Sequence, residues 1–453
     1  MDAVIFFPWL STLEVRVEQA GHELIVGLDI GTTKVCAVVA EILPDRQLKI
    51  IGIGDSESKG LRKGMVVNIE DTVRSIRQAI EVAAQMAGCN IGTVFVGIAG
   101  GHIMGINSHG VIAVQGNEVT AHDVKRVLDA ARTVAIPSDR EVIHILPQEY
   151  IVDSQRGIVD PIGMAGVRLE VNVHIVTAAV SSAQNIVRSS NRAGLHVEDI
   201  VLESLASAKA VLTDEEREIG VALVDLGGGT SDIAIFENNA IKHTAVVPLG
   251  GSTLTNDIAF GLRTPTKSAE RIKVKYGCAL QDLVQMDETI EVPSVGGRQP
   301  QKLSRLVLAD ICEARMEEIL TFVDRTLVNS GCKDRIRAGV VLTGGAALIE
   351  GCVELGEQIF GVPTRIGYPT NVKGLTDVVN NPKFSTAVGL LHFGAEKVLA
   401  RQGAAPEPSE QPVQSAAESK PQPQQPAPAA PHSEDGLFSR LMKQMRRWFQ
   451  DIT

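Results

Sequence analysis

The sequence predicts a duplicated two-lobed α/β protein, because one strand–turn–strand pattern occurs twice and helical and strand segments alternate around it. Each copy is an apolar strand, a glycine turn after an aspartate, and a returning strand. The copies occupy residues 24–40 and 221–236, and a third glycine turn follows an apolar strand at residues 340–347. Such a repeat indicates two related α/β units whose glycine turns face each other.

The composition is that of a globular protein with a large core. The chain has 453 residues, 44% of them hydrophobic and 21% charged, which allows two or three domains. The net charge of −11 argues against general nucleic-acid binding, because phosphates attract basic surfaces. The six cysteines form no CxxC pair, so we expect buried thiols in a reducing compartment instead of zinc ligands or disulfides.

The first lobe is predicted over residues 23–102. Its glycine hairpin is followed by a helix over 71–87, with apolar residues at helical spacing, and by a buried strand over 93–99. The stretch 103–178 then departs from this alternation, since β-rich segments surround one helix over 122–133. It predicts a small interaction domain inserted into the first lobe.

The second lobe is predicted over residues 179–401. Its hairpin is followed by helical patterns over 254–261, 265–276 and 303–327, with a glycine-rich loop over 292–300. The buried strand over 340–342 then enters the third glycine turn.

Both ends of the chain differ from these lobes. Residues 1–22 are predicted to be an N-terminal extension, and their apolar stretch, with a proline and no preceding basic residue, is not a secretory signal. Residues 402–435 are rich in Pro, Gln, Ala and Ser, which predicts a disordered linker. No apolar run reaches the about 18 residues that a membrane-spanning helix needs.

Residues 436–453 predict an amphipathic helix, with apolar residues on one face and basic residues on the other. A docking helix for another protein or a coiled-coil strand is the alternative. Trp and Phe beside basic residues favour an interfacial helix that binds anionic lipids. The membrane-binding residues are then Leu437, Phe438, Arg440, Leu441, Lys443, Met445, Arg446, Arg447, Trp448 and Phe449.

The first two glycine turns have the composition of phosphate-binding loops. Backbone N–H groups surround a phosphate best where glycine removes the Cβ, and threonine hydroxyls add donors. Asp29 and Asp225 end the two strands, where carboxylates can hold the water shell of Mg²⁺. The predicted ligands of ATP are Asp29, Gly31, Thr32, Thr33 and Lys34 in one loop and Asp225, Gly227, Gly228, Gly229 and Thr230 in the other. One such turn alone would be an ordinary hairpin.

The three turns resemble, in chain order, the phosphate 1, phosphate 2 and adenosine motifs of the actin, heat-shock chaperone and sugar-kinase superfamily. This resemblance implies an actin-like fold, with Gly344, Gly345 and Ala346 against the nucleoside. It implies that Glu270 and Lys273 reach the adenine and ribose, although a solvated helix face has the same composition. Glu203 resembles an acidic residue placed near the attacking water, but a carboxylate is also favoured at any helix start.

The globular region further resembles one branch of that superfamily, the bacterial FtsA cell division family. The motifs are GLDIGTTKVCAVVAEI, PQEYIVDSQRGIVDPIGMAGVRLEVNVHIVTA, VDLGGGTSDIAIF, VPSVGGR and VVLTGGAALIEG. They cover residues 23 to 400, and the insert and VPSVGGR discriminate this branch. Residues 1–20 match nothing in the pattern, which indicates a start codon placed too early.

The resemblance implies a peripheral protein on the cytoplasmic face of the inner membrane, at the division septum. It implies that the chain anchors the tubulin-like protein FtsZ, self-associates into filaments, and recruits later division proteins through the insert. The FtsZ C-terminal peptide would bind near Arg298 and Arg305, although both arginines could simply be solvated. ATP hydrolysis is expected to be at most slow.

Two other functions fit the phosphate loops. A sugar kinase would need a catalytic base above a sugar pocket, and no such signature is apparent. A pilus-assembly scaffold of the same superfamily also carries an inserted domain. The linker, the amphipathic tail and VPSVGGR favour the division protein.

Overall fold

The computed structural model describes residues 18–19, 22–296 and 298–403. Most of the N-terminal extension, the linker from residue 404 and the tail helix 436–453 lie outside the described residues. The described residues belong to one compact unit that ends at Gly403. Within them, no helix is long and apolar enough to cross a membrane.

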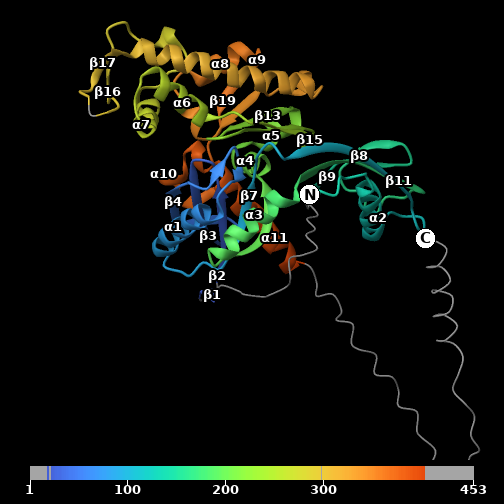
Figure 1. Ribbon diagram of the computed structural model, residues 1–453. Coiled ribbons are helices and arrows are strands. Elements are labelled where there is room, and N and C mark those ends of the chain that lie inside the picture. Colours follow the sequence, from blue (N-terminus) through green and yellow to red (C-terminus); the bar gives the residue numbers. More distant parts are fainter. Residues whose placement is uncertain (1–17, 20–21, 297, 404–453) are drawn as a thin grey trace, which may run out of the picture. The chain divides into compact units, whose positions relative to one another are not determined.

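The first lobe is built on a sheet whose central strand order is β12-β7-β2-β3-β4 (Figure 1). The hairpin strands β2, β3 and β4 are antiparallel, and β7 and β12 run parallel to β2. The short strands β20 and β1 extend the sheet beside β4 and β2. The bounds are β1 (Glu18–Gln19), β2 (His22–Ile30), β3 (Lys34–Ile42), β4 (Leu48–Glu57), β7 (Thr93–Ile98), β12 (His196–Leu202) and β20 (Val372–Gly374).

The second lobe repeats this topology with the order β15-β14-β13-β18-β19. Strands β13, β14 and β15 are antiparallel, and β18 and β19 run parallel to β13. The bounds are β13 (Val221–Leu226), β14 (Ser231–Glu237), β15 (Ala240–Val247), β18 (Val340–Thr343) and β19 (Thr364–Ile366). Two sheets with the same order and the same directions confirm the predicted duplicated fold.

Helices pack on each sheet, and small residues set how closely they approach. Helix α1 begins after Asn68, whose side chain accepts a hydrogen bond from the Asp71 N–H, and ends at Gly88 with a φ of 66°. A Cβ built on Gly54 of β4 would lie 2.0 Å from the Ala79 carbonyl oxygen of α1, so only glycine permits this contact. The first-lobe helices are α1 (Ile69–Ala87), α3 (Val180–Arg192), α4 (Glu203–Val211), α10 (Thr376–Val379) and α11 (Ser385–Gly403). The predicted boundary of the second lobe at residues 179–401 therefore needs correction, because residues 180–211 and 372–403 pack with the first sheet.

The second lobe contains the helices that the periodicity predicts. The predicted glycine-rich loop connects two short antiparallel strands, β16 (Thr289–Val292) and β17 (Gln301–Ser304). The helices are α5 (Asp214–Ile219), α6 (Gly251–Gly261), α7 (Thr266–Tyr276), α8 (Arg305–Asn329) and α9 (Cys352–Phe360). The apolar faces of α6, α7, α8 and α9 form a core separate from that of the first lobe.

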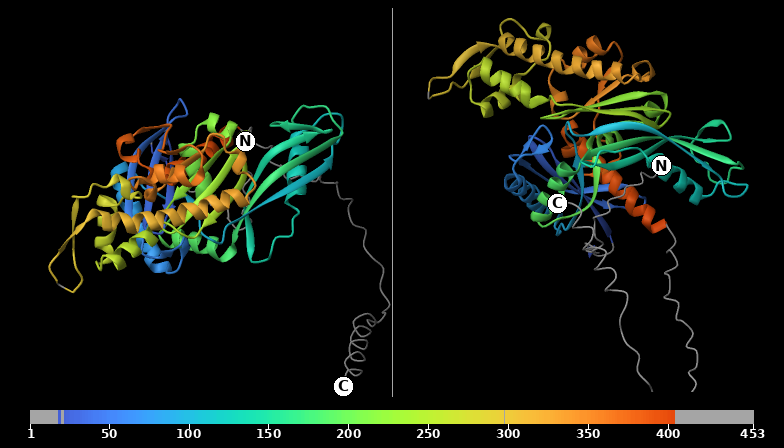
Figure 2. Two further views of the ribbon diagram at one scale, coloured as in Figure 1. Left: turned by 90° about the horizontal axis from the view of Figure 1, so that it is seen from above. Right: turned by 45° about the vertical axis from the view of Figure 1, so that its right-hand side comes forward.

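The insert between β7 and α3 is an antiparallel sheet of order β10-β9-β11-β8 with one helix, α2, against it (Figure 2). It has its own hydrophobic core, which explains why the segment departs from the lobe pattern. The bounds are β8 (Met104–Ala113), α2 (Ala121–Arg132), β9 (Arg140–Val152), β10 (Gln155–Ile158) and β11 (Arg168–Ala179).

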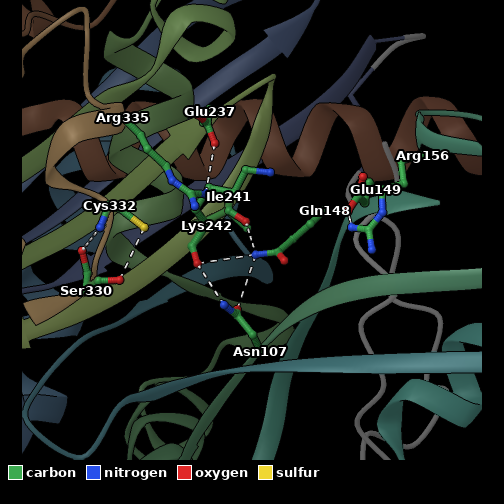
Figure 3. A network of polar contacts seen from close by, with 10 residues as sticks. All are labelled: Asn107, Gln148, Glu149, Arg156, Glu237, Ile241, Lys242, Ser330, Cys332 and Arg335. Atoms are coloured by element: carbon green, nitrogen blue, oxygen red, sulfur yellow. Dashed lines mark hydrogen bonds and ion pairs between the residues drawn. The ribbon is translucent and has the colours of Figure 1, made fainter. Parts of the chain in front are cut away.

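Polar side chains of the insert also bind the edge strand β15 of the second sheet. Gln148 Nε2 donates to the Ile241 carbonyl at 2.8 Å, and Asn107 lies beside the Lys242 carbonyl (Figure 3). The buried His174 ring lies 2.8 Å from the Thr244 hydroxyl. The insert therefore belongs to the first lobe by sequence and contacts the second lobe through side chains.

Candidate functional site

The two glycine turns lie against each other. In the first, the Gly31 N–H donates to the Lys34 carbonyl at 3.0 Å, and in the second the Gly227 N–H donates to the Thr230 carbonyl at 3.0 Å. A Cβ built on Gly228 would lie 2.5 Å from Thr33 Cγ2. A Cβ on the next residue, Gly229, would lie 2.4 Å from the Thr32 hydroxyl oxygen. Residues from both predicted loops thus meet, and side chains larger than glycine would obstruct the contact.

Four carboxyl groups face this meeting point. Asp29 and Asp225 are the second-last residues of β2 and β13, and Asp232 is opposite Asp225 in the β13–β14 register. These three aspartates are buried. Glu203, the first residue of α4, completes the group, since its carboxyl group interacts electrostatically with all three.

Burial raises the pKa of each group, and repulsion from neighbouring carboxylates adds to the shift for Asp29, Asp232 and Glu203. Burial raises the pKa of Asp29 to about 6, with Lys34 opposing the shift and Asp225 adding to it. Burial, aided by Asp225, raises the pKa of Asp232 to about 7, although the Thr230 hydroxyl opposes the shift. The pKa of Glu203 is raised well above its usual value by burial and then by the three aspartates. The site therefore favours a bound cation, whose charge would offset this repulsion.

Asp225 is held in place by hydroxyl groups. The Ser207 hydroxyl donates to Asp225 Oδ2 at 2.6 Å, and Thr386 contributes a second hydrogen bond at 3.3 Å. Burial still raises the pKa of Asp225, with these hydrogen bonds and Lys34 acting against the shift. Two hydroxyl donors and the nearby Lys34 charge favour the ionised form of Asp225, so its surroundings support a negative charge.

Asp232 has one satisfied oxygen and one that is not. The Thr230 hydroxyl donates to Asp232 Oδ2 at 2.7 Å, whereas the buried Oδ1 has no hydrogen-bond partner among the described residues. Such an oxygen fits a water molecule of a hydrated cation. No three His, Cys, Asp or Glu side chains within the described part are arranged to hold a metal ion directly.

Lys34 follows the first glycine turn and is the first residue of β3. Its ammonium group donates to the Lys383 carbonyl at 2.6 Å and lies 4.5 Å from the centroid of the Phe384 ring. Its charge opposes the rise in the pKa of Asp29 and of Asp225, so it lies within electrostatic reach of the two predicted cation ligands.

The third glycine turn adjoins the second loop. Gly344 has a φ of 86°, and a Cβ there would lie 2.3 Å from Asp225 Oδ1, so this position requires glycine. At Gly345 the nearest such contact is 3.9 Å away, at the Lys383 Cβ, which leaves one face of the turn open. The turn thus continues the glycine-lined surface away from the carboxyl groups.

Helices α6 and α7 lie on the other side of this turn. A Cβ on Gly251, the first residue of α6, would lie 3.1 Å from the Ala346 Cβ and 3.4 Å from Lys273 Nζ. Lys273 forms an ion pair with Glu270 at 2.8 Å and donates to the Gly251 carbonyl at 3.1 Å. The residues proposed to contact the nucleoside are thereby brought together.

The sequence reasoning did not identify four contributors to the site. Asp232 could have been found from the hairpin, since the four-residue turn 227–230 between β13 and β14 places it opposite Asp225. Ser207 and Thr386 come from helices far apart in the chain, and no local signal marks them. The fourth is Gly97 of β7, where a Cβ would lie 2.9 Å from Glu203 Cγ, so this glycine makes room for the Glu203 side chain.

The two arginines suggested for peptide binding differ in their surroundings. Arg298 is exposed in the β16–β17 loop. Arg305 is mostly buried, with ion pairs to Glu288 at 2.8 Å and to Glu350, and it donates to the Tyr276 carbonyl. The expectation of a free basic contact at Arg305 therefore needs correction, because its guanidinium group already holds α7, α8 and the loop before β16 together.

Two glycine loops from a duplicated α/β fold, with carboxyl groups between them, define an actin-like protein. Solved structures show the same fold. The PilM-PilN type IV pilus biogenesis complex matches with a TM-score of 0.59, at 16% identity over 82% of this chain and 98% of that one. MreB5 of Spiroplasma citri bound to ADP matches with a TM-score of 0.51, at 15% identity over 84% of this chain and 99% of that one.

The chain belongs to the cell division protein FtsA family. The family model for cell division protein FtsA matches residues 222–389, and the model for the SHS2 domain inserted in FtsA matches residues 100–177. FtsA of Pseudomonas aeruginosa is 57% identical over 375 residues, 83% of this chain and 90% of the relative. FtsA of Escherichia coli is 44% identical over 390 residues, 84% of this chain and 93% of the relative. The suspected family is thereby confirmed.

Proposed function

We propose that this chain binds ATP with Mg²⁺ between its glycine loops and uses it to control assembly. The single observation that supports this most strongly is the meeting of Gly228 and Gly229 with Thr32 and Thr33 beside Asp29, Asp225 and Asp232. Backbone amides and threonine hydroxyls would bind the phosphates, and the three aspartates would hold the hydrated cation. The relative MreB5, solved with ADP, has the same fold and supports the choice of an adenine nucleotide.

Hydrolysis is proposed to be slow. Glu203 is the candidate general base, and burial together with repulsion from the three aspartates raises the pKa of its carboxyl group well above the usual value, which favours the protonated form. A protonated carboxyl group cannot accept a proton from water. Nucleotide binding would then mainly favour one arrangement of the lobes, with hydrolysis a later and slower event.

The cellular role that we propose is that of a membrane-attached adaptor for the division ring. Residues 436–453 would bind anionic lipids at the cytoplasmic face of the inner membrane, and the linker 402–435 would give them reach. The insert would bind later division proteins. Self-association into filaments would strengthen membrane attachment by avidity.

The FtsZ C-terminal peptide is proposed to bind the second lobe near the β16–β17 loop. Arg298 is retained as a contact because its side chain is exposed and could pair with an acidic residue. Arg305 is no longer proposed, since binding there would require the peptide to displace two internal carboxylates. A pull-down with an FtsZ tail peptide distinguishes this adaptor from a pilus-assembly scaffold, which shares the fold but would not retain the peptide.

The nucleotide assignment is tested by the substitution Gly228→Asp. It adds a carboxylate at the point where the two loops meet, so it should abolish ATP binding measured by calorimetry with Mg²⁺. Gly101→Asp is the matched control, because no atom lies within 4 Å of a Cβ built there. Equal ATP affinity in the two variants would contradict the site. Robust phosphorylation of sugars by the wild type would instead revive the kinase alternative.

A further inference from the structure

A short hairpin not included among the predicted ligands reaches the same point. Strands β5 (Leu61–Arg62) and β6 (Met65–Val66) are joined by the two residues Lys63 and Gly64. Their φ angles are +50° and +75°, as in a type I′ turn, where Asn, Asp or Gly is normally favoured at the first position. Lysine is therefore placed where its backbone conformation is unfavourable, which suggests that the side chain has a function.

The tip of this hairpin touches both glycine loops. A Cβ built on Gly229 would lie 2.9 Å from the Cα of Lys63. The Gly64 N–H donates to the Thr32 hydroxyl at 3.0 Å. The backbone of Lys63 therefore lies where the two loops meet, and its side chain is exposed.

The hairpin tip cannot easily retreat from the loops. A Cβ on Gly64 would lie 2.8 Å from the Gly100 Cα and 3.0 Å from the Ala99 carbonyl carbon, so the turn packs directly on the chain that follows β7. Because the turn is held from behind by Gly100 and from the front by Thr32, the position of the Lys63 Cα is fixed by backbone packing.

The two ends of the second glycine loop have different neighbours, and these neighbours indicate which phosphate would lie beside Lys63. Its first residue, Gly227, accepts a hydrogen bond at 2.9 Å from the Gly251 N–H, next to the proposed nucleoside contacts Ala346 and Lys273. Its last glycine, Gly229, lies against Lys63 instead. A polyphosphate that runs along this loop from the nucleoside side therefore ends beside Lys63.

We infer that Lys63 binds the terminal phosphate of a nucleoside triphosphate and so distinguishes it from a diphosphate. This inference rests on the proposed nucleotide site and adds the group that reads the third phosphate. The ammonium group supplies a charge-assisted hydrogen bond that a diphosphate, shorter by one phosphate, does not reach. Lys34, tethered to the Lys383 carbonyl, serves the inner part of the site.

The test compares Lys63→Asn with wild type in calorimetric titrations with Mg-ATP and Mg-ADP. Asparagine tolerates the positive φ better than lysine, so the variant is expected to fold at least as well, which thermal unfolding checks. Loss of a charge-assisted hydrogen bond should weaken ATP binding about 10-fold or more and change ADP binding by less than about 2-fold. Arg62→Asn is the matched control, since it removes an exposed cation one residue away.

Each outcome has a distinct meaning. A selective loss of ATP affinity in Lys63→Asn alone supports the inference. Unchanged ATP affinity, an equal loss for ATP and ADP, or the same effect in Arg62→Asn overturns it while leaving the nucleotide site intact. Absence of nucleotide binding by the wild type would overturn the proposed function as well.

Discussion

Replacing Asp232 by asparagine should stabilise the nucleotide-free protein and weaken its response to Mg-ATP. The buried carboxylate has one oxygen bonded to Thr230 and one without a hydrogen-bond partner in the described part of the chain. Asparagine keeps an acceptor for the Thr230 hydroxyl and has no charge. The variant therefore removes the repulsion with Asp225 without changing the volume of the side chain.

The magnitude follows from the pKa. Since the pKa of Asp232 is raised from 3.8 to about 7, the folded protein binds a proton more tightly than the unfolded chain. This contribution to stability is fully present below about pH 4 and is lost as the pH rises through about 7. At pH 8 the charged carboxylate costs about 4 kcal/mol, and about 1 kcal/mol of that loss occurs between pH 6 and pH 8.

Urea unfolding of the nucleotide-free protein at pH 6, 7 and 8 measures this effect. The free energy of unfolding of Asp232→Asn should exceed that of wild type by an amount that grows with pH. The exposed Asp129→Asn controls for the change in net charge and should show no such growth. Added Mg-ATP should stabilise the wild type more than Asp232→Asn, since the cation loses one carboxylate partner. A variant that is less stable at every pH, with an unchanged response to Mg-ATP, would refute this reasoning.

Three further predictions concern packing, the membrane and the second lobe. Gly228→Ala should lower ATP affinity, because its methyl group would overlap the first loop, and it should not stabilise the nucleotide-free protein against heat. Unchanged ATP affinity in calorimetry would count against this contact. Trp448→Glu should reduce liposome flotation strongly, since it places a charge on the apolar face predicted for residues 436–453, whereas equal flotation of variant and wild type would exclude membrane binding by that face. Arg305→Ala should destabilise the protein by about 1 kcal/mol in urea unfolding, because Glu288 and Glu350, which are themselves partly exposed, lose their mostly buried partner. An unaffected midpoint would restore Arg305 as a candidate for peptide binding.

The sequence predicted the duplication and both glycine loops because those features are local. An apolar strand that ends in Asp-x-Gly and returns as a second strand is visible in a short window, and its recurrence implies the second lobe. The register of β13 and β14 makes Asp232 part of the same local pattern, so it was within reach of sequence reasoning. The start of α1 is likewise marked by Asn68 and its end by Gly88.

The remaining parts of the site depend on long-range packing. Ser207 and Thr386 meet at Asp225 only because α4 and α11 pack against each other. Arg305 has the composition of a surface contact, yet it is buried between carboxylates that come from residues 288 and 350. Hydrogen bonds and ion pairs of this kind leave no periodic signal.

The sequence by itself determined the duplicated α/β class, the presence of an insert, the two loops suited to phosphate and the family to which the chain belongs. These follow from hydrophobic periodicity and glycine turns, which are encoded over a few residues. Only the tertiary structure decided that four carboxyl groups share one site, that the insert binds β15, and that Lys63 lies at the junction of the loops. Those arrangements arise when the two lobes fold and bring together residues that are distant in the chain. Which of these residues touch is set by how the helices and sheets pack, and a short stretch of sequence does not encode that.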